Sequence, residues 1–464
     1  MEAGATNATV PEPGVTQLPA RVRTGTAADV RLMDRRAFLR RAAEAGLALP
    51  SLSATLGACE RNEPEMTERS GFEGQPDGGV LAATPPMGWN SWNVYGDAID
   101  EEKILAIADA MVDSGMRNAG WEYVMLDDGW QRVRGSRFLY DFDYDPKKFP
   151  RGIKFLADYV HKRGMKFGIY SGPGVETCAG YTGSAGHEEQ DAAVFASWGV
   201  DHLKYDSCCW PGKGGEGVFE MHKRMSDALK TTGRDIVLHV CHCGWDDVWE
   251  WAREAGGHHW RIGQDITDDF DVPGHREDYY FDVLDMIDRG VGLEAYSRPG
   301  GWNDYDMLVV NLKGEGALVG DGATPEEYRT HFSMWAILSS PLIIGSDLTR
   351  MDAYTLETLT NAEVIALNQD RLGIQAARVR KDGDLEVFAK PLDNGDWGVG
   401  LLNRGRTDAE VGISWRRDLG VEWSAASVRD LWAHRNLGTY SDRFAAHIPP
   451  HVATILRVTP ENGS

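Results

Sequence analysis

Acidic residues follow the ends of several short apolar runs in this sequence. Asp127 and Asp128 come after Tyr-Val-Met-Leu, Asp206 after His-Leu-Lys-Tyr, and Asp265 after Trp-Arg-Ile-Gly-Gln. Asp304 and Asp306 lie in Trp-Asn-Asp-Tyr-Asp at 302–306. If the runs are parallel strands, these carboxylates meet at one edge of a sheet. So many like charges are costly unless cations or a hydroxyl-rich ligand offset them.

Two basic residues are placed to offset part of that charge. Lys204 lies two positions before Asp206, so on a strand both side chains point to the same face. A nearby cation stabilises the ionised form of a carboxylate. Arg261 lies close to Asp265 in the same way. The pattern predicts a polar site for a neutral, hydroxyl-rich molecule.

The elements that must position these residues alternate between strands and helices. Strands are predicted at 87–92, 123–127, 166–170, 202–205, 236–240, 260–265, 302–307 and 342–345. Amphipathic helices are predicted at 101–114, 152–162, 188–197, 217–231, 279–289 and 325–338. Eight such alternations predict an α/β fold, a (β/α)8 TIM barrel over residues 83–374, with an open doubly wound sheet as the alternative. Barrel enzymes build their sites at the C-terminal ends of the strands, where these carboxylates fall.

The pattern changes after about residue 375. Short alternating apolar runs at 385–389, 397–402, 409–413 and 447–458 are separated by Asp, Asn, Gly and Pro. They predict a C-terminal antiparallel β-sandwich over residues 375–464. We identify no candidate catalytic residues in this region and expect it to pack against the barrel.

Charge and composition narrow the class of partner. The chain has 464 residues and a formal net charge of −23, which would repel nucleic acid and anionic membranes. The 16 tryptophans are numerous enough to allow stacking on sugar rings, although most are expected in the core. We therefore expect a neutral glycan or oligosaccharide as the partner and no nucleic acid.

The N-terminal residues have the features of an export signal. Arg35 and Arg36 open a basic run, an apolar segment follows, and Leu-Gly-Ala-Cys ends at Cys59. The arginine pair is typical of a twin-arginine signal, and the second motif resembles a lipobox in which Cys59 carries lipid. An ordinary basic amphipathic helix is the alternative. Residues 1–59 are interpreted as extension and signal, and 60–82 as a flexible linker; the predicted location is periplasmic or on the cell surface, with a membrane tether through Cys59.

Cysteine spacing gives no sign of a metal site. The six cysteines do not form paired Cys-x2-Cys motifs, so a structural zinc is not expected. The chemistry predicted below needs only carboxylates and water, and no metal or organic cofactor is expected.

Seven motifs in order resemble glycoside hydrolase family 27. They are Pro-Pro-Met-Gly-Trp-Asn-Ser-Trp-Asn at 85–93, Leu-Asp-Asp-Gly-Trp at 126–130, Gly-Ile-Tyr at 168–170, Trp-Gly-Val-Asp-His-Leu-Lys-Tyr-Asp at 198–206, Gly-Trp-Asn-Asp-Tyr-Asp-Met-Leu at 301–308, Pro-Leu-Ile-Ile-Gly at 341–345 and Asn-Ala-Glu-Val-Ile-Ala-Leu-Asn-Gln-Asp at 361–370. The resemblance spans roughly residues 83–460. That family contains α-galactosidases, α-N-acetylgalactosaminidases and β-L-arabinopyranosidases.

The resemblance implies a retaining double displacement. Asp206 would be the nucleophile, and Asp265 the general acid and then the general base, with opposed protonation states. Substrate-binding roles are implied for Trp92, Asp127, Asp128, Lys204, Cys241, His242, Arg261 and Asp306. A disulfide is implied between Cys178 and Cys208, with two buried free thiols as the alternative.

The sequence departs from the family pattern at three places, and the first of them bears on the substrate. The loop after the fifth strand reads Cys-His-Cys-Gly-Trp at 241–245, where the bulky His242 and Trp245 disfavour an acetamido pocket. Gly129 replaces a half-cystine, and Tyr305 replaces a proline. The pair at 127–128 favours a sugar with a hydroxymethyl group. We therefore predict removal of terminal α-linked galactose, with β-L-arabinopyranosides or α-N-acetylgalactosaminides as alternative substrates, and a non-catalytic glycan-binding lipoprotein as the competing class.

Overall fold

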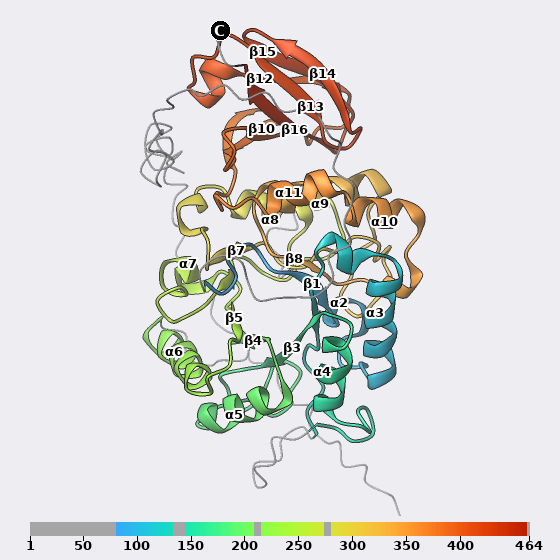
Figure 1. The fold of residues 1–464 in the computed structure, drawn as a ribbon, viewed down its shortest axis with the longest axis vertical. Coiled ribbons are helices and arrows are strands. Elements are labelled where there is room, and N and C mark those ends of the chain that lie inside the picture. The colour runs from blue at the N-terminus through green and yellow to red at the C-terminus, as the bar shows by residue number, and fades with distance from the viewer. Residues whose placement is uncertain (1–79, 133–143, 208–214, 273–279, 462–464) are drawn as a thin grey trace, which may run out of the picture.

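The computed structural model describes residues 80–132, 144–207, 215–272 and 280–461 (Figure 1). The proposed signal with Cys59, most of the linker, and Cys208 lie outside the described residues. Among the helices of the described ranges, none combines the length and apolar character that crossing a membrane requires.

Eight parallel strands form the first sheet. They are β1 (Met87–Asn90), β2 (Tyr123–Met125), β3 (Lys166–Ser171), β4 (His202–Asp206), β5 (Val237–Cys241), β6 (His259–Arg261), β7 (Trp302–Asp304) and β8 (Leu342–Ile344). Their order is β7-β6-β5-β4-β3-β2-β1-β8, so neighbours in sequence are neighbours in the sheet. Just after β7, the backbone nitrogen of Leu308 donates to Ile343 O at 2.6 Å, and Gly345 N donates back to Leu308 O at 2.9 Å. These bonds join the two outer strands, and the predicted TIM barrel is confirmed.

The barrel helices lie where amphipathic periodicity predicted them, with a few additions. They are α2 (Trp92–Tyr95), α3 (Glu101–Asp113), α4 (Ile153–His161), α5 (Glu188–Trp198), α6 (Gly215–Thr231), α7 (Val248–Trp251), α8 (Val283–Arg289), α9 (Pro325–Ile337), α10 (Ala353–Leu359) and α11 (Ala362–Asn368). Side-chain caps fix the starts of several helices. In α9, Thr324 and Glu327 form a reciprocal capping box and Pro325 occupies the first turn.

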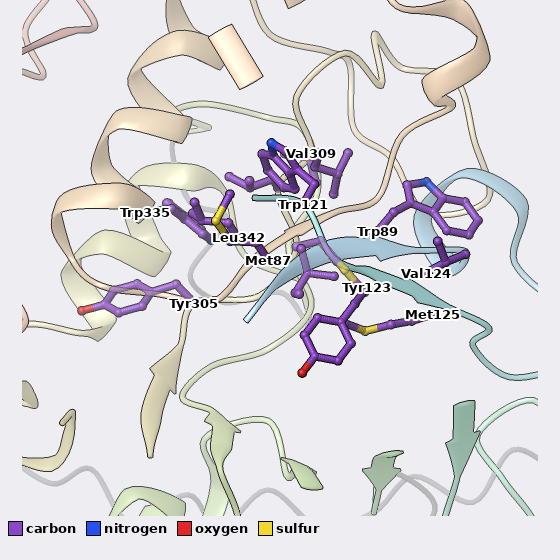
Figure 2. Close-up of a cluster of buried hydrophobic side chains, with 14 of the residues drawn as sticks. Met87, Trp89, Trp121, Tyr123, Val124, Met125, Tyr305, Val309, Trp335 and Leu342 are labelled. Atoms are coloured by element: carbon purple, nitrogen blue, oxygen red, sulfur yellow. The ribbon is translucent and has the colours of Figure 1, made fainter. Parts of the chain in front are cut away.

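Apolar side chains fill the space between strands and helices. Figure 2 shows part of this core, with Trp89 of β1, Val124 of β2, Leu342 of β8 and Trp335 of α9. All four are fully buried. Strands covered on both faces need apolar residues at consecutive positions, which explains why β2 and β8 are continuous apolar runs.

The C-terminal domain is an antiparallel β-sandwich, as predicted. Its strands are β9 (Ala377–Asp382), β10 (Leu385–Pro391), β11 (Trp397–Asn403), β12 (Ala409–Ser414), β13 (Ala426–Asp430), β14 (Arg435–Tyr440), β15 (Arg443–Ile448) and β16 (Val452–Pro460). Six of them form a sheet in the order β14-β13-β16-β11-β10-β9, and β12 pairs with β15. The single run expected at 447–458 is instead divided between β15 and β16, because Pro449 and Pro450 interrupt the backbone pairing.

The two domains share a core. The sandwich lies beyond α9 and α11, on the side away from the barrel strands (Figure 1). Ile337 of α9 belongs to the same buried cluster as Leu402 of β11 and Ile455 of β16. Polar contacts reinforce the apolar ones: Ala453 N donates to Thr330 Oγ1 at 3.0 Å. The sandwich therefore completes the burial of a barrel helix.

Candidate active site

Strand β4 places Lys204 and Asp206 at the C-terminal end of the barrel. Both side chains are buried, and Nζ of Lys204 lies 4.0 Å from Oδ2 of Asp206. The same ammonium donates to Oδ2 of Asp127 at 2.9 Å, just beyond the end of β2. Asn90, the last residue of β1, donates Nδ2 to that oxygen at 2.7 Å. Residues from three strands therefore form one charge-paired group.

The environment of Asp206 contains opposing influences on its proton. Burial raises the pKa of Asp206, and the negative charge of Asp265 adds to that rise. The positive charge of Lys204 and a hydrogen bond from the Cys241 thiol act in the other direction. The expected effect of Lys204 is present, but desolvation is larger. Lys204 itself stays charged: although burial opposes its charge, its pKa is raised well above the ordinary value, chiefly by Asp127.

Strand β6 organises a second group around Arg261. Its Nη2 donates to Oδ1 of Asp265 at 3.0 Å, and Nη1 lies 2.8 Å from Oδ1 of Asp306. The backbone nitrogen of Ile266 donates to the other oxygen of Asp306 at 2.7 Å. Burial raises the pKa of Asp306 to about 7, against the opposing charge of Arg261. Arg261 thus bridges the acidic residues that follow β6 and β7.

The two predicted catalytic carboxylates lie at the same end of the barrel but differ in access to solvent. The side chain of Asp206 is 9 % exposed and that of Asp265 is 30 % exposed. They are close enough that the charge of Asp265 raises the pKa of Asp206. A buried carboxylate beside a cation can act as a nucleophile, and a more exposed carboxylate near it can exchange protons with solvent as an acid/base.

Asp127 and Asp128 are adjacent in sequence but have different partners. Asp128 accepts hydrogen bonds from Thr177 Oγ1, Ala179 N and Gly129 N, each at 2.8 Å. Burial raises its pKa to about 6 despite these donors. Asp127 pairs with Lys204, whereas Asp128 fixes the loop that follows β3.

The loop after β5 lies beside Asp206. Cys241 is the parallel partner of Asp206 in the sheet, and it is a free, buried thiol. His242 is also buried, with Nδ1 2.7 Å from Ser207 Oγ and Nε2 3.0 Å from Asp246 Oδ2. Both ring nitrogens of His242 are therefore engaged by the protein. Trp245, by contrast, is 38 % exposed.

Two other predicted residues, Trp92 and Cys178, lie in the described part of the chain. Trp92 begins α2, is half-buried, and donates its backbone nitrogen to Asn90 Oδ1 at 2.9 Å. Cys178 is disulfide-bonded and its sulfur accepts a hydrogen bond from the Tyr170 hydroxyl at 3.0 Å. Its expected partner, Cys208, lies outside the described residues.

Sequence reasoning missed two features of the site. Asn90 lies in a recognised motif, yet its bond to Asp127 depends on the pairing of β1 with β2. The second feature is a group of buried histidines beneath the charged residues: His202, His239 and His259. Burial lowers the pKa of His202 and of His239 well below the ordinary value. No sequence motif predicts that these histidines lie together, because they belong to three different strands.

Comparisons with known proteins cover both domains. Residues 84–370 match the family model described as "Alpha galactosidase A", and residues 382–458 match "Alpha galactosidase C-terminal beta sandwich domain". "Alpha-galactosidase A" of Cellvibrio japonicus is 41 % identical over 391 residues, covering 82 % of this chain and 93 % of that protein.

Solved structures give the same result. Alpha-galactosidase I from Mortierella vinacea is 38 % identical with a TM-score of 0.76, covering 82 % of this chain and 99 % of that one. The Saccharomyces cerevisiae alpha-galactosidase solved with raffinose is 30 % identical with a TM-score of 0.74, covering 82 % and 98 %.

Proposed function

Because the chain belongs to the alpha-galactosidase family of glycoside hydrolase family 27 and is a retaining alpha-galactosidase, we propose that Asp206 is its nucleophile and Asp265 its acid/base. The observation that carries this assignment is the contrast between the two carboxylates. Asp206 is buried beside Lys204 and accepts a bond from Cys241, whereas Asp265 is partly open to solvent and held by Arg261.

In the first step, an oxygen of Asp206 attacks the anomeric carbon and the bond to the leaving oxygen breaks. Asp265 gives its proton to that oxygen, so the aglycone leaves as an alcohol. In the second step, Asp265 takes a proton from water as the water oxygen attacks the same carbon and releases Asp206. Two inversions give net retention.

Binding of the sugar falls to the residues around this pair. Lys204 and Asp127 provide a buried donor and acceptor for ring hydroxyls, and Trp92 provides an aromatic face. A sugar that lacks one of the matching hydroxyls would leave a buried charged group unpaired, which disfavours it strongly. We propose α-galactosyl oligosaccharides of the raffinose type as substrates, on the basis of the raffinose-bound relative.

Rescue by azide tests the assignment of Asp206. Asp206→Ala should lose turnover of nitrophenyl α-galactoside by more than about a thousandfold, because no nucleophile remains. Added azide should occupy the space left by the removed carboxylate and attack the anomeric carbon from that side, which gives β-galactosyl azide, identified by NMR. Asp113→Ala, an exposed aspartate of α3, is the control and should retain activity. Full activity in Asp206→Ala, or an azide product of α configuration, would contradict the assignment.

Leaving-group dependence tests Asp265. In Asp265→Ala, substrates with poor leaving groups should slow far more than dinitrophenyl galactoside, which departs without protonation. Equal losses for both classes of substrate would show that Asp265 does not protonate the leaving oxygen.

We also propose export by the twin-arginine route with lipid attached at Cys59, on the basis of the sequence motifs at 35–41 and 56–59. Radiolabelled fatty acid should enter the wild-type chain and not Cys59→Ala. Replacing Arg35 and Arg36 by lysine should leave the protein in the cytoplasm; unchanged fractionation of both variants would refute the proposal.

A further inference from the structure

Three histidines form a layer inside the barrel, directly beneath the charged residues of the active site. His202 lies two residues before Lys204 on β4, and His259 lies two residues before Arg261 on β6. His239 stands in the same relation to Cys241 on β5. Residues two apart on a strand point to the same face, so all three imidazoles point into the barrel.

The three rings lie against one another. His239 and His259 are paired in register on neighbouring strands, and their rings stack with centroids 4.0 Å apart. Nε2 of His202 lies 2.8 Å from Nε2 of His259. One ring nitrogen from each histidine lies within 4.8 Å of the others. A tetrahedral zinc ion about 2.0–2.1 Å from each nitrogen requires nitrogens about 3.3–3.4 Å apart, so binding would separate Nε2 of His202 and His259 slightly and turn His239 out of its stack on His259.

A carboxylate orients this group from the side. Asp304, on β7 and almost fully buried, accepts a hydrogen bond from Nδ1 of His259 at 2.9 Å. That bond places the proton of His259 on Nδ1 and leaves a lone pair on Nε2, facing His202. A carboxylate behind a histidine is the usual outer partner of a histidine ligand to a metal. Asp304 also brings negative charge to an interior where Lys204 and Arg261 are the nearby cations.

The group is incompletely satisfied as a hydrogen-bond network. Nδ1 of His202 has no hydrogen-bond partner among the described residues. Nε2 of His239 lies 3.1 Å from Asp304 Oδ2 but is not aligned for a hydrogen bond. Buried polar atoms without partners are costly. A cation bound to Nε2 of His239 would satisfy that atom, whereas Nδ1 of His202 would stay unpaired, because Nε2 is the atom of His202 that faces His259.

We propose that His202, His239 and His259 bind one divalent transition-metal ion of the zinc class inside the barrel, with Asp304 orienting His259. Imidazole nitrogens favour zinc, cobalt, nickel and copper, whereas magnesium and calcium require oxygen ligands. The ion does not touch the substrate. It joins β4, β5 and β6 just below the residues that perform catalysis, and so has a structural role. This proposal is independent of the catalytic assignments above.

Metal uptake by the full-length, untagged protein tests the proposal. Protein freed of metal by a chelator should take up one equivalent of Zn²⁺ in calorimetry, and no Mg²⁺ or Ca²⁺. With Co²⁺, the wild-type protein should develop visible absorption bands of a nitrogen-ligated ion, which Zn²⁺ then removes by displacement. This measurement needs no variant.

Variants locate the ion. His239→Asn should lose stoichiometric uptake, and Asp304→Asn should bind zinc about 10–100-fold more weakly. His331→Gln is the matched control, because His331 is a buried histidine of α9 and should leave uptake unchanged. No stoichiometric uptake by the wild type would overturn the proposal, as would full uptake by His239→Asn. A cobalt–thiolate band would also overturn it, by placing the ion at Cys241 and Cys243.

Discussion

Lys204→Met should shift the acid limb of the pH–activity profile towards higher pH. The limb of kcat/KM reports ionisation of the free enzyme's nucleophile, and Lys204 is the cation that favours ionised Asp206. At the observed 4.0 Å, with an effective dielectric constant of about 20, the attraction is about 4 kcal/mol. Since one pKa unit is about 1.4 kcal/mol, the shift is at most about 3 units.

The assay is kcat/KM for nitrophenyl α-galactoside measured across the pH range. We expect the limb to move up by about 1–3 units in Lys204→Met, in addition to any loss of the plateau from weaker sugar binding. Lys204→Arg keeps the charge and should keep the limb near its wild-type position. Lys166→Met is the second control, because Lys166 begins β3 at the opposite end of the barrel and pairs with Glu122.

An acid limb that stays in place in folded Lys204→Met would refute this reasoning. It would mean that burial and the Cys241 hydrogen bond alone set the proton affinity of Asp206. A limb moved to lower pH would require a different group to be the nucleophile.

Three further predictions concern stability. Lys390 is buried, and desolvation lowers its pKa to about 7. Because the unfolded chain holds that proton up to about pH 10, the free energy of unfolding should rise between pH 7 and 10, by up to about 4 kcal/mol. Urea titrations should show this rise in the wild type and not in Lys390→Met. Asp288 of α8 accepts hydrogen bonds from Arg378 and Arg404 of the sandwich. Desolvation raises the pKa of Asp288, but these arginines outweigh it and lower the pKa to about 2. Its contribution of about 2 kcal/mol should therefore be present above pH 4 and lost as the pH falls towards 2, and Asp288→Asn should flatten that dependence of the melting temperature. In Gly290→Ala the new Cβ would lie 2.0 Å from the Tyr305 hydroxyl, so unfolding should become about 1–3 kcal/mol easier, and an unchanged melting temperature would contradict the contact.

The barrel was predictable because its signals are local. Strands such as β4 and helices such as α3 carry their periodicity in their own residues, and the parallel order follows from the alternation. In the sandwich, β9, β13 and β14 were not predicted, and β14 was missed for the opposite reason. Residues 435–440 are largely exposed and include Gly438, so apolar alternation is absent and only pairing with β13 makes the segment a strand.

The same division applies to the site. Asp206 was predicted because it ends a strand within a recognisable motif, and Asp265 because it follows the apolar run that contains β6. The attachment of His242 to Ser207 and Asp246 was not predictable, since it depends on how two loops meet. Tyr305 was noted only as a replacement for proline. The structure explains it: the ring fills the space above Gly290, and its hydroxyl accepts a hydrogen bond from Gln375 Nε2 at 2.9 Å.

Helix α9 has no face turned to water along much of its length, because its residues from Tyr328 to Ile337, apart from Arg329, are buried between the barrel and the sandwich. A catalytic fragment cut at residue 374 would bare this strip, and we expect it to aggregate rather than remain active. Engineers who wish to exchange the sandwich for that of a relative should therefore graft the outward side of α9 together with β11 and β16. The boundary for such chimaeras should therefore be placed within α9 and not in the segment that joins the barrel to the sandwich.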